Sequence, residues 1–339
     1  MPLPTQEDYI AVLNHLIGAF EKQRPQLTRR GRPLHYSQLL LLRFFLLMHF
    51  KHITCFKAQH RWLSLRPAQA REMGFCAVPH RTTLMRRYRQ LHQWLTPLLS
   101  FVAHWAKACP PQTNSQTTRA LSSYPIFEDK SLFKARGPVW HQKHRQTGHI
   151  PKGLKHLDTA ADWGKSRYHG WVYGYALHLS VDTHGFPLLA SVQKASVSEA
   201  TVLAEKAQAL WQLSPTELVG DDAYTNLKRT KYWAQHGVAC VAPGLRLGDK
   251  AQSRAYKRWL QTPDNQALLQ ARSRIEPLFD LLSKIGGISG QQKPLPVQGL
   301  DKVRTFLLTC VLLMQLAMIL NRIWGLPNRN ISHMRAVWT

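Results

Sequence analysis

This chain has few acidic residues compared with its basic residues. Its 339 residues include 19 Asp and Glu against 45 Lys and Arg, which gives a formal net charge of +26. Such an excess of positive charge is typical of proteins that bind a polyanion, above all nucleic acid. Because carboxylates are so few, a carboxylate that stands in or beside an apolar segment requires a specific explanation.

Cysteine is also rare, and its pattern argues against two kinds of site. The five cysteines are odd in number and form no Cys-x-x-Cys pair, which disfavours a disulfide framework and indicates reduced thiols in the cytoplasm. The pairs Cys55/His60 and Cys76/His80 offer an alternative zinc site, but their spacings are loose for a zinc finger. The chain has neither a Walker-type phosphate loop nor a Gly-x-Gly-x-x-Gly fingerprint, so it does not indicate ATP or a nicotinamide cofactor.

Long uninterrupted apolar runs are missing as well. The two candidates are Leu39–Phe50, which Arg43 interrupts, and Phe306–Leu320, which Arg304 and Arg322 flank. Both are shorter than the ~20 residues that a membrane-spanning helix needs. We therefore expect two buried helices and no membrane partner.

The N-terminal third is almost free of acids. Residues 22–127 contain Glu72 as their only carboxylate, against seventeen Lys and Arg. The patterns here are helical, with an apolar helix over His35–His52 and a second over Thr83–Lys107 that Thr82 or Thr83 caps. Residues 1–109 are thus predicted to be an all-α DNA-binding region. The DNA contacts predicted on the second helix are Arg86, Arg87 and Arg89.

The period of the sequence changes after residue 123. Residues 110–123 are rich in Pro, Gln, Thr, Asn and Ser and are predicted to be a linker. Residues 124–325 are then predicted to form an α/β domain, and residues 326–339 a C-terminal tail. The expected strands of the α/β domain are Tyr124–Phe133, Tyr173–Val181, Phe186–Gln193, Glu217–Gly220 and Val238–Ala242. Its expected helices are Ser198–Leu213, Leu227–His236 and Asn265–Lys284.

A basic insertion, residues 134–170, separates the first two of these strands. Its eight Lys and Arg stand among Trp140, Trp163, Tyr168 and several histidines. Cations beside aromatic rings suit contact with a nucleic-acid backbone and stacking on bases, so DNA contact is predicted here, with Lys134 and Arg136 nearest the first strand. The alternative is a solvated loop.

Three carboxylates lie at positions typical of catalytic or metal-binding residues. Asp129 lies in an apolar strand, Asp221 at the end of another, and Glu276 in a helical pattern four residues after Arg272. Carboxylates from separate segments can converge on a pair of Mg²⁺ ions that promote attack on a phosphodiester. Successive side chains of a strand point to opposite faces, so Glu128 cannot share a site with Asp129, nor Asp222 with Asp221. Glu128 and Asp222 remain the alternatives.

These segments carry a family resemblance over about residues 120–320. Asp129-x-Ser131 followed by Ala135-x-Gly137 resembles the first-aspartate segment of DDE transposases of bacterial insertion sequences. Gly220-Asp221-x-Ala223-Tyr224 resembles their second-aspartate segment, and Arg272-x-x-x-Glu276 with Lys284 is similar to their glutamate helix. In that family the lysine follows the glutamate by seven residues, whereas Lys284 follows Glu276 by eight.

The resemblance implies both a fold and a reaction. The fold is an RNase H-like mixed sheet flanked by helices, which Phe306–Leu320 would complete. Asp129, Asp221 and Glu276 would be catalytic and would hold Mg²⁺ or Mn²⁺, two ions in all, while Arg272 and Lys284 grip DNA phosphates. Water would cut double-stranded DNA at the terminal inverted repeats, and the freed 3′-OH would attack target DNA.

Such a reaction implies a homo-oligomer that holds both ends of the element together, and a cytoplasmic, nucleoid-associated location. Two alternatives remain open. One is a metal-dependent endonuclease on the same fold, and the other is a non-catalytic DNA-binding protein derived from a transposase.

Overall fold

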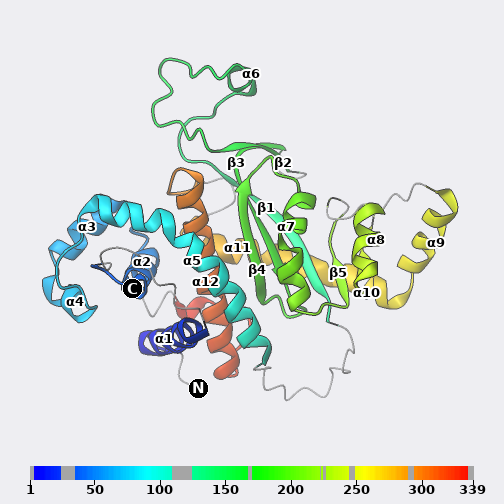
Figure 1. The fold of residues 1–339 in the computed structure, drawn as a ribbon, viewed down its shortest axis with the longest axis horizontal. Helices are drawn as coiled ribbons and strands as arrows, with labels where there is room; N and C mark the ends of the chain where they lie inside the picture. Colours follow the sequence, from blue (N-terminus) through cyan, green and yellow to red (C-terminus); the bar gives the residue numbers. More distant parts are fainter. Residues whose placement is uncertain are drawn as a thin grey trace.

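The computed structural model describes residues 4–23, 35–108, 124–166, 170–221, 223, 227–243, 249–288 and 294–334. Its N-terminal part is all helical, as predicted, and lies on one side of the central sheet (Figure 1). The N-terminal helices are α1 (Gln6–Gln23), α2 (Gln38–Phe50), α3 (Phe56–Ser64), α4 (Pro67–Glu72) and α5 (Arg81–Ala108). The predicted linker, residues 110–123, lies outside the described residues.

In the described part of the chain, six strands form one mixed sheet: β1 (Ile126–Lys134), β2 (Asp162–Ser166), β3 (Gly170–Val181), β4 (Pro187–Lys194), β5 (Glu217–Val219) and β6 (Ala239–Val241). Their order is β2–β3–β1–β5–β6, and β4 also pairs with β3. β3 runs antiparallel to β1 and β4, whereas β5 is parallel to both β1 and β6. An antiparallel hairpin beside parallel strands is the arrangement of an RNase H-like sheet, and it confirms the predicted fold class.

Helices cover both faces of the sheet. One face lies under α7 (Glu199–Gln212), which begins at the N-cap Ser198, whose side chain accepts a hydrogen bond from Thr201 N–H. The other face packs against α5 and α12 (Leu300–Ile323), and α11 (Glu276–Ile285) packs against α12. The remaining helices are α6 (Gln142–Gln146), α8 (Leu227–Gln235), α9 (Lys250–Leu260) and α10 (Pro263–Arg272). In Figure 1, α6 projects beyond the end of the sheet, and α8 and α9 lie on the side opposite the N-terminal helices.

Helix α12 joins the N-terminal helices to the sheet. It is 24 residues long and apolar enough to cross a membrane by length and composition, but 94% of its most apolar window is buried inside the protein. Thr305 Oγ1 donates to Tyr88 O of α5 at 2.8 Å, and Gln315 Nε2 donates to Leu99 O of α5 at 3.1 Å. The prediction that Phe306–Leu320 is a buried helix that completes the core is therefore confirmed, although the helix extends further at both ends.

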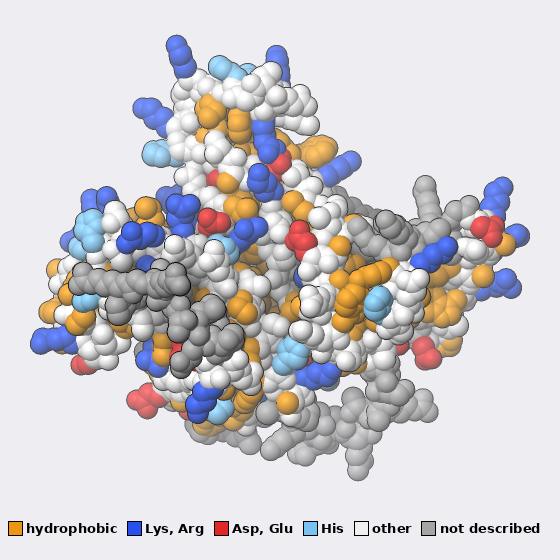
Figure 2. Space-filling view, in the orientation of Figure 1, with side chains coloured by type: hydrophobic (Ala, Val, Ile, Leu, Met, Phe, Trp, Pro, Cys, Tyr) orange, Lys and Arg blue, Asp and Glu red, His pale blue; other side chains and the backbone are white. Residues whose placement is uncertain are grey.

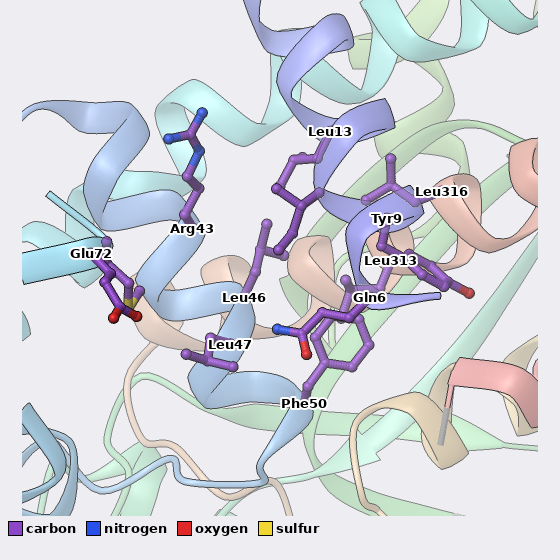
Figure 3. Close-up of a pocket in the computed structure, with 12 residues that line it drawn as sticks. Gln6, Tyr9, Leu13, Arg43, Leu46, Leu47, Phe50, Glu72, Leu313 and Leu316 are labelled. Carbon is purple, nitrogen blue, oxygen red and sulfur yellow. The ribbon is translucent and has the colours of Figure 1, made fainter. Parts of the chain in front are cut away.

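The predicted C-terminal tail also packs against this core as far as residue 334. Asn321 Nδ2 donates to Asn328 O and Asn330 O, and the buried His333 contacts the Tyr9 hydroxyl of α1 through Nδ1 at 3.0 Å. An apolar cavity of about 260 Å³ lies between α1, α2 and α12 (Figure 3). Tyr9 and Leu313 line it from opposite helices, and none of the predicted site residues does.

Most predicted elements are confirmed, and two are wrong. α5 begins at Arg81 rather than after a cap at Thr82 or Thr83. The helix predicted over Asn265–Lys284 is divided into α10 and α11 by a 3₁₀ turn, Ser273–Ile275. Pro277 explains the break, because proline has no N–H to donate and its ring crowds the carbonyl four residues earlier.

Candidate active site

Asp129 lies in the middle of β1, where its neighbour on β3 is Leu179. Its Oδ1 accepts a hydrogen bond from Lys130 N–H at 2.8 Å, and its Oδ2 lies 3.8 Å from Arg272 Nη1. The side chain is only 16% exposed. Asp129 is thus held by one backbone donor and one guanidinium at the edge of the core.

Asp221 follows β5 after one intervening glycine. β5 pairs in parallel with β1, with Phe127 opposite Val219, so continuing that register by two residues brings Asp221 alongside Asp129. Asp221 Oδ1 accepts from Ala223 N–H at 3.0 Å, a local turn that fixes its direction. The alternative ligand Asp222 and the motif residue Tyr224 lie outside the described residues.

Glu276 is the first residue of α11 and is exposed. A carboxylate at a helix N-terminus is favoured by the helix dipole. The 3₁₀ turn before it contacts β1, so Glu276 starts its helix beside the strand that carries Asp129. Arg272 pairs with Asp129 rather than with Glu276, and Asp280 pairs with Lys284 at 2.6 Å.

The pKa of Asp129 shows that the other two carboxylates lie near it. Burial raises the pKa of Asp129 from 3.8 to about 6. The Lys130 N–H and Arg272 oppose this rise in pKa, while the negative charges of Asp221 and Glu276 add to it. Both carboxylates therefore lie within electrostatic range of Asp129, from three different elements of the chain.

The donor chemistry of this cluster suits a divalent cation, since carboxylate oxygens are the ligands that Mg²⁺ and Mn²⁺ prefer. Within the described part of the chain, however, no three His, Cys, Asp or Glu side chains are gathered closely enough to form a ready-made metal site. The three carboxylates are near one another but are not closed to ligating distance, and a guanidinium lies against one of them.

Comparison with known proteins identifies this region. Residues 127–290 match the family described as the transposase DDE domain. This stretch of the chain is similar to a transposase DDE domain. The match contains Asp129, Asp221 and Glu276, and it ends before α12.

Solved structures give a weaker likeness. A crystal structure of a pre-cleavage Mos1 transpososome is 11% identical, with 84% of this chain and 87% of that chain covered and a TM-score of 0.22. A crystal structure of the mariner Mos1 paired end complex with Mg is 13% identical, with 82% and 88% covered and a TM-score of 0.21. Overlaps this small support no conclusion about the present chain. No curated protein matches it.

The neighbouring acid Glu128, which also lies in the matched region, has a different environment. It is fully buried on the α7 face, where Lys206 Nζ donates to its Oε2 at 2.6 Å and the Ser180 hydroxyl donates to its Oε1. The predicted alternation along β1 is therefore confirmed: Glu128 and Asp129 face opposite sides of the sheet.

The residues predicted to contact DNA differ in their exposure and in the contacts that their side chains make within the protein. Arg86 and Lys134 are exposed, and Arg136 is exposed while it donates to Pro296 O at 2.6 Å. Arg89 lies 3.6 Å from Asp301, with more than half of its side chain exposed. Arg87 is half-buried and donates to Gln38 Oε1 at 2.8 Å, so it also ties α5 to the start of α2. DNA binding by these residues stays a prediction.

The described part of the insertion, residues 134–166, forms an arm with its own small core. Trp140 is buried, with Nε1 donating to His149 O, and Trp163 Nε1 donates to Trp140 O at 2.8 Å. These two rings therefore help to hold the arm together, and DNA contact by the insertion stays a prediction. Tyr168 lies outside the described residues.

Both acids of the arm are used to attach it to the sheet. The buried Asp158 accepts from the Tyr175 hydroxyl at 2.9 Å and from Gly299 N–H at 2.9 Å, and Asp162 pairs with Arg145. The motif glycine Gly137 has a φ of +95°, and an added Cβ would lie 2.5 Å from His156 O. The outer surface of the arm is left cationic, as Figure 2 shows at its tip.

The sequence analysis missed a second cationic surface on α9. Tyr256 docks this helix by donating to Ala242 O and Cys240 O at the end of β6, while Arg254, Lys257 and Arg258 are exposed. The 3.6-residue spacing of these cations was available in the sequence, but no helix was predicted there. The alternative zinc site gains no support, since the described residues contain no metal-binding group of three or more ligands.

Proposed function

We propose that this protein is a transposase that cuts double-stranded DNA at the ends of its element and joins the freed 3′-OH to target DNA. The observation that carries the proposal is the cluster of Asp129, Asp221 and Glu276, which come from β1, the end of β5 and the start of α11. Burial, together with the charges of Asp221 and Glu276, raises the pKa of Asp129, and all three residues lie within the stretch that matches the transposase DDE domain.

Asp129, Asp221 and Glu276 would hold Mg²⁺ or Mn²⁺, and activity should be measured with each of the two metals. A bound pair of such ions supplies charge stabilisation at the attacking and leaving oxygens of a phosphodiester. The protein's part is to fix the carboxylates: the strand β1 fixes Asp129, the Asx turn fixes Asp221, and the helix start fixes Glu276. No covalent bond between protein and DNA is required.

The DNA partner would be bound through phosphate contacts by the cationic surfaces around this cluster. The arm lies beyond one end of the sheet, with α5 on one side and α9 on the other (Figure 1), and each carries exposed Lys or Arg. We propose that a duplex bound at the carboxylates contacts more than one of these surfaces. We further propose a homo-oligomer that holds both element ends, acting in the cytoplasm at the nucleoid.

The test is cleavage of a duplex that carries the inverted repeats flanking the gene, with Mg²⁺ and with Mn²⁺. Asp129→Asn, Asp221→Asn and Glu276→Gln are each expected to lower the cleavage rate by at least about a hundredfold, since each removes part of several kcal/mol of charge stabilisation. DNA binding, measured by gel retardation, should persist in all three.

Asp280→Asn is the matched control, because Asp280 is an exposed carboxylate on the same helix as Glu276, one turn away. It should cleave at close to the wild-type rate. Joining of a pre-cut 3′-OH end to a second duplex separates a transposase from an endonuclease. Wild-type cleavage by all three site variants would sink the assignment, and binding without any metal-dependent cleavage would favour a non-catalytic protein.

A further inference from the structure

Arg272 occupies an unexpected place. Its guanidinium lies 3.8 Å from Asp129 Oδ2, and the two side chains are 24% and 16% exposed. Among the residues that the structure describes, no other Lys or Arg forms an ion pair with Asp129. A single positive charge thus stands beside the most buried carboxylate of the cluster.

The local fold directs Arg272 there. α10 ends at Arg272, and the 3₁₀ turn Ser273–Ile275 that follows packs against β1. Along one continuous helix, Arg272 would be expected to pair with Glu276, four residues later. Its guanidinium pairs instead with Asp129 on β1. A cation at the C-terminal end of α10 is also favoured by that helix's dipole.

We propose that Arg272 is a placeholder for the divalent cation: it neutralises Asp129 in the metal-free protein and gives up that carboxylate when the metal binds. This inference rests on the proposed function, which makes Asp129 a metal ligand. Three carboxylates near one another repel, so some positive charge is needed while the metal is absent. The same guanidinium repels an incoming divalent ion, and once displaced it is available to a DNA phosphate.

The placeholder role predicts a direction that other roles do not share. If Arg272 competes with the metal, removing its charge strengthens metal binding. If instead it orients Asp129 for the metal, removal weakens binding. If it serves only as a phosphate contact, removal leaves metal affinity in the absence of DNA unchanged.

The experiment is calorimetric titration of the full-length, metal-free protein with Mn²⁺, without DNA. Arg272→Gln is expected to bind Mn²⁺ about three- to tenfold more tightly than wild type, the range set by a partly screened ion pair. Arg274→Gln is the matched control, because Arg274 is an exposed arginine on the adjacent 3₁₀ turn and its loss changes the net charge equally. It should change the affinity less than twofold.

Arg272→Lys separates charge from fold. Lysine keeps the positive charge, so its Mn²⁺ affinity should stay close to that of wild type. In EDTA, Arg272→Gln should melt at a lower temperature than wild type, and saturating Mn²⁺ should remove that difference; Arg274→Gln should show neither effect. These melting curves also verify that each variant is folded.

The outcomes distinguish this inference from the proposed function. If Asp129→Asn abolishes Mn²⁺ binding while Arg272→Gln binds no more tightly than Arg274→Gln, the metal site stands and the placeholder role fails. Weaker binding by a folded Arg272→Gln also overturns it. If neither wild type nor Arg272→Gln binds Mn²⁺, the metal site and the placeholder role fail together.

Discussion

Glu128 and Asp129 are consecutive carboxylates on one strand, and the fold treats them oppositely. Glu128 faces α7, is fully buried, is neutralised by Lys206 and accepts a hydrogen bond from the Ser180 hydroxyl. Asp129 faces the other side, keeps a small exposed fraction and lies near two further carboxylates, which help to raise its pKa. Two carboxylates one position apart thus differ in role: Glu128 belongs to the core and Asp129 to the candidate active site.

The difference shows what distinguishes a structural acid from one available for chemistry. A structural acid has a matched buried cation, so replacing it leaves that cation without a partner. An acid at a functional site is kept where its charge is only partly balanced, and the protein loses stability by keeping it there. The comparison therefore predicts opposite effects on stability for substitutions at neighbouring positions.

The largest effect on stability is expected at Glu128. Glu128→Ala should lower the free energy of unfolding by about 3–5 kcal/mol, because Lys206 would remain buried without its partner. Urea unfolding at neutral pH measures this. The double variant Glu128→Met/Lys206→Met removes both charges and should recover most of the loss.

Cleavage by this double variant is the sharper half of the test. Its rate per folded molecule should stay near that of wild type, since the pair lies on the opposite face of β1 from Asp129. The comparison would be broken by a double variant that is folded and yet as inactive as Asp129→Asn.

The next largest effect is expected at Asp129, where substitution should raise the stability of the protein in a pH-dependent way, rather than lower it as at Glu128. The folded-state pKa of Asp129, about 6, lies above its ordinary value of 3.8, so the folded protein binds more protons than the unfolded chain between those two values. Stability therefore falls as pH rises through this window. Without metal, Asp129→Asn should be more stable than wild type by about 2 kcal/mol at pH 7.5, and by almost nothing at pH 4.

Thermal or urea unfolding in EDTA across pH 4–8 measures this difference. Adding Mn²⁺ at pH 7.5 should stabilise wild type but not Asp129→Asn, because a ligand that binds only the folded state shifts unfolding by mass action. A stability difference that is constant with pH would show that Asp129 is not strained by its charge.

Strand alternation explains how much of this site the sequence could predict. Period-two patterning places Glu128 and Asp129 on opposite faces of β1, and the end of an apolar strand locates Asp221. Sequence could not predict that Lys206 neutralises Glu128, because that contact joins residues 78 positions apart on two different elements.

The break before Glu276 was missed for a different reason. Pro277 is visible in the sequence, but proline is tolerated in the first turn of a helix, so the surrounding helical pattern hid the 3₁₀ turn. The direction of Arg272 depends on that turn. The internal role of Trp140 was likewise hidden, because an aromatic among lysines has the same sequence pattern whether it is buried or exposed.

The smallest effect is expected at Lys130, which tests whether the whole α7 side of β1 is structural. Lys130 pairs with Glu199 in the first turn of α7, and both side chains are 15% exposed. Lys130→Met should cost less stability than Glu128→Ala, because both side chains of this pair keep some contact with solvent, whereas Glu128 keeps none. Glu199 would still be favoured by the N-terminal dipole of α7, which limits the loss further.

Cleavage should not change in Lys130→Met, although residue 130 touches Asp129. The contact is made by the backbone N–H of Lys130, which donates to Asp129 Oδ1, and the substitution leaves that donor in place. The side chain points toward α7, away from the three carboxylates. A measured cleavage rate more than about tenfold below wild type, in a protein whose unfolding curve is unchanged, would mean that charge on the α7 side of β1 reaches the site through the sheet, and the separation of the two faces would have to be abandoned.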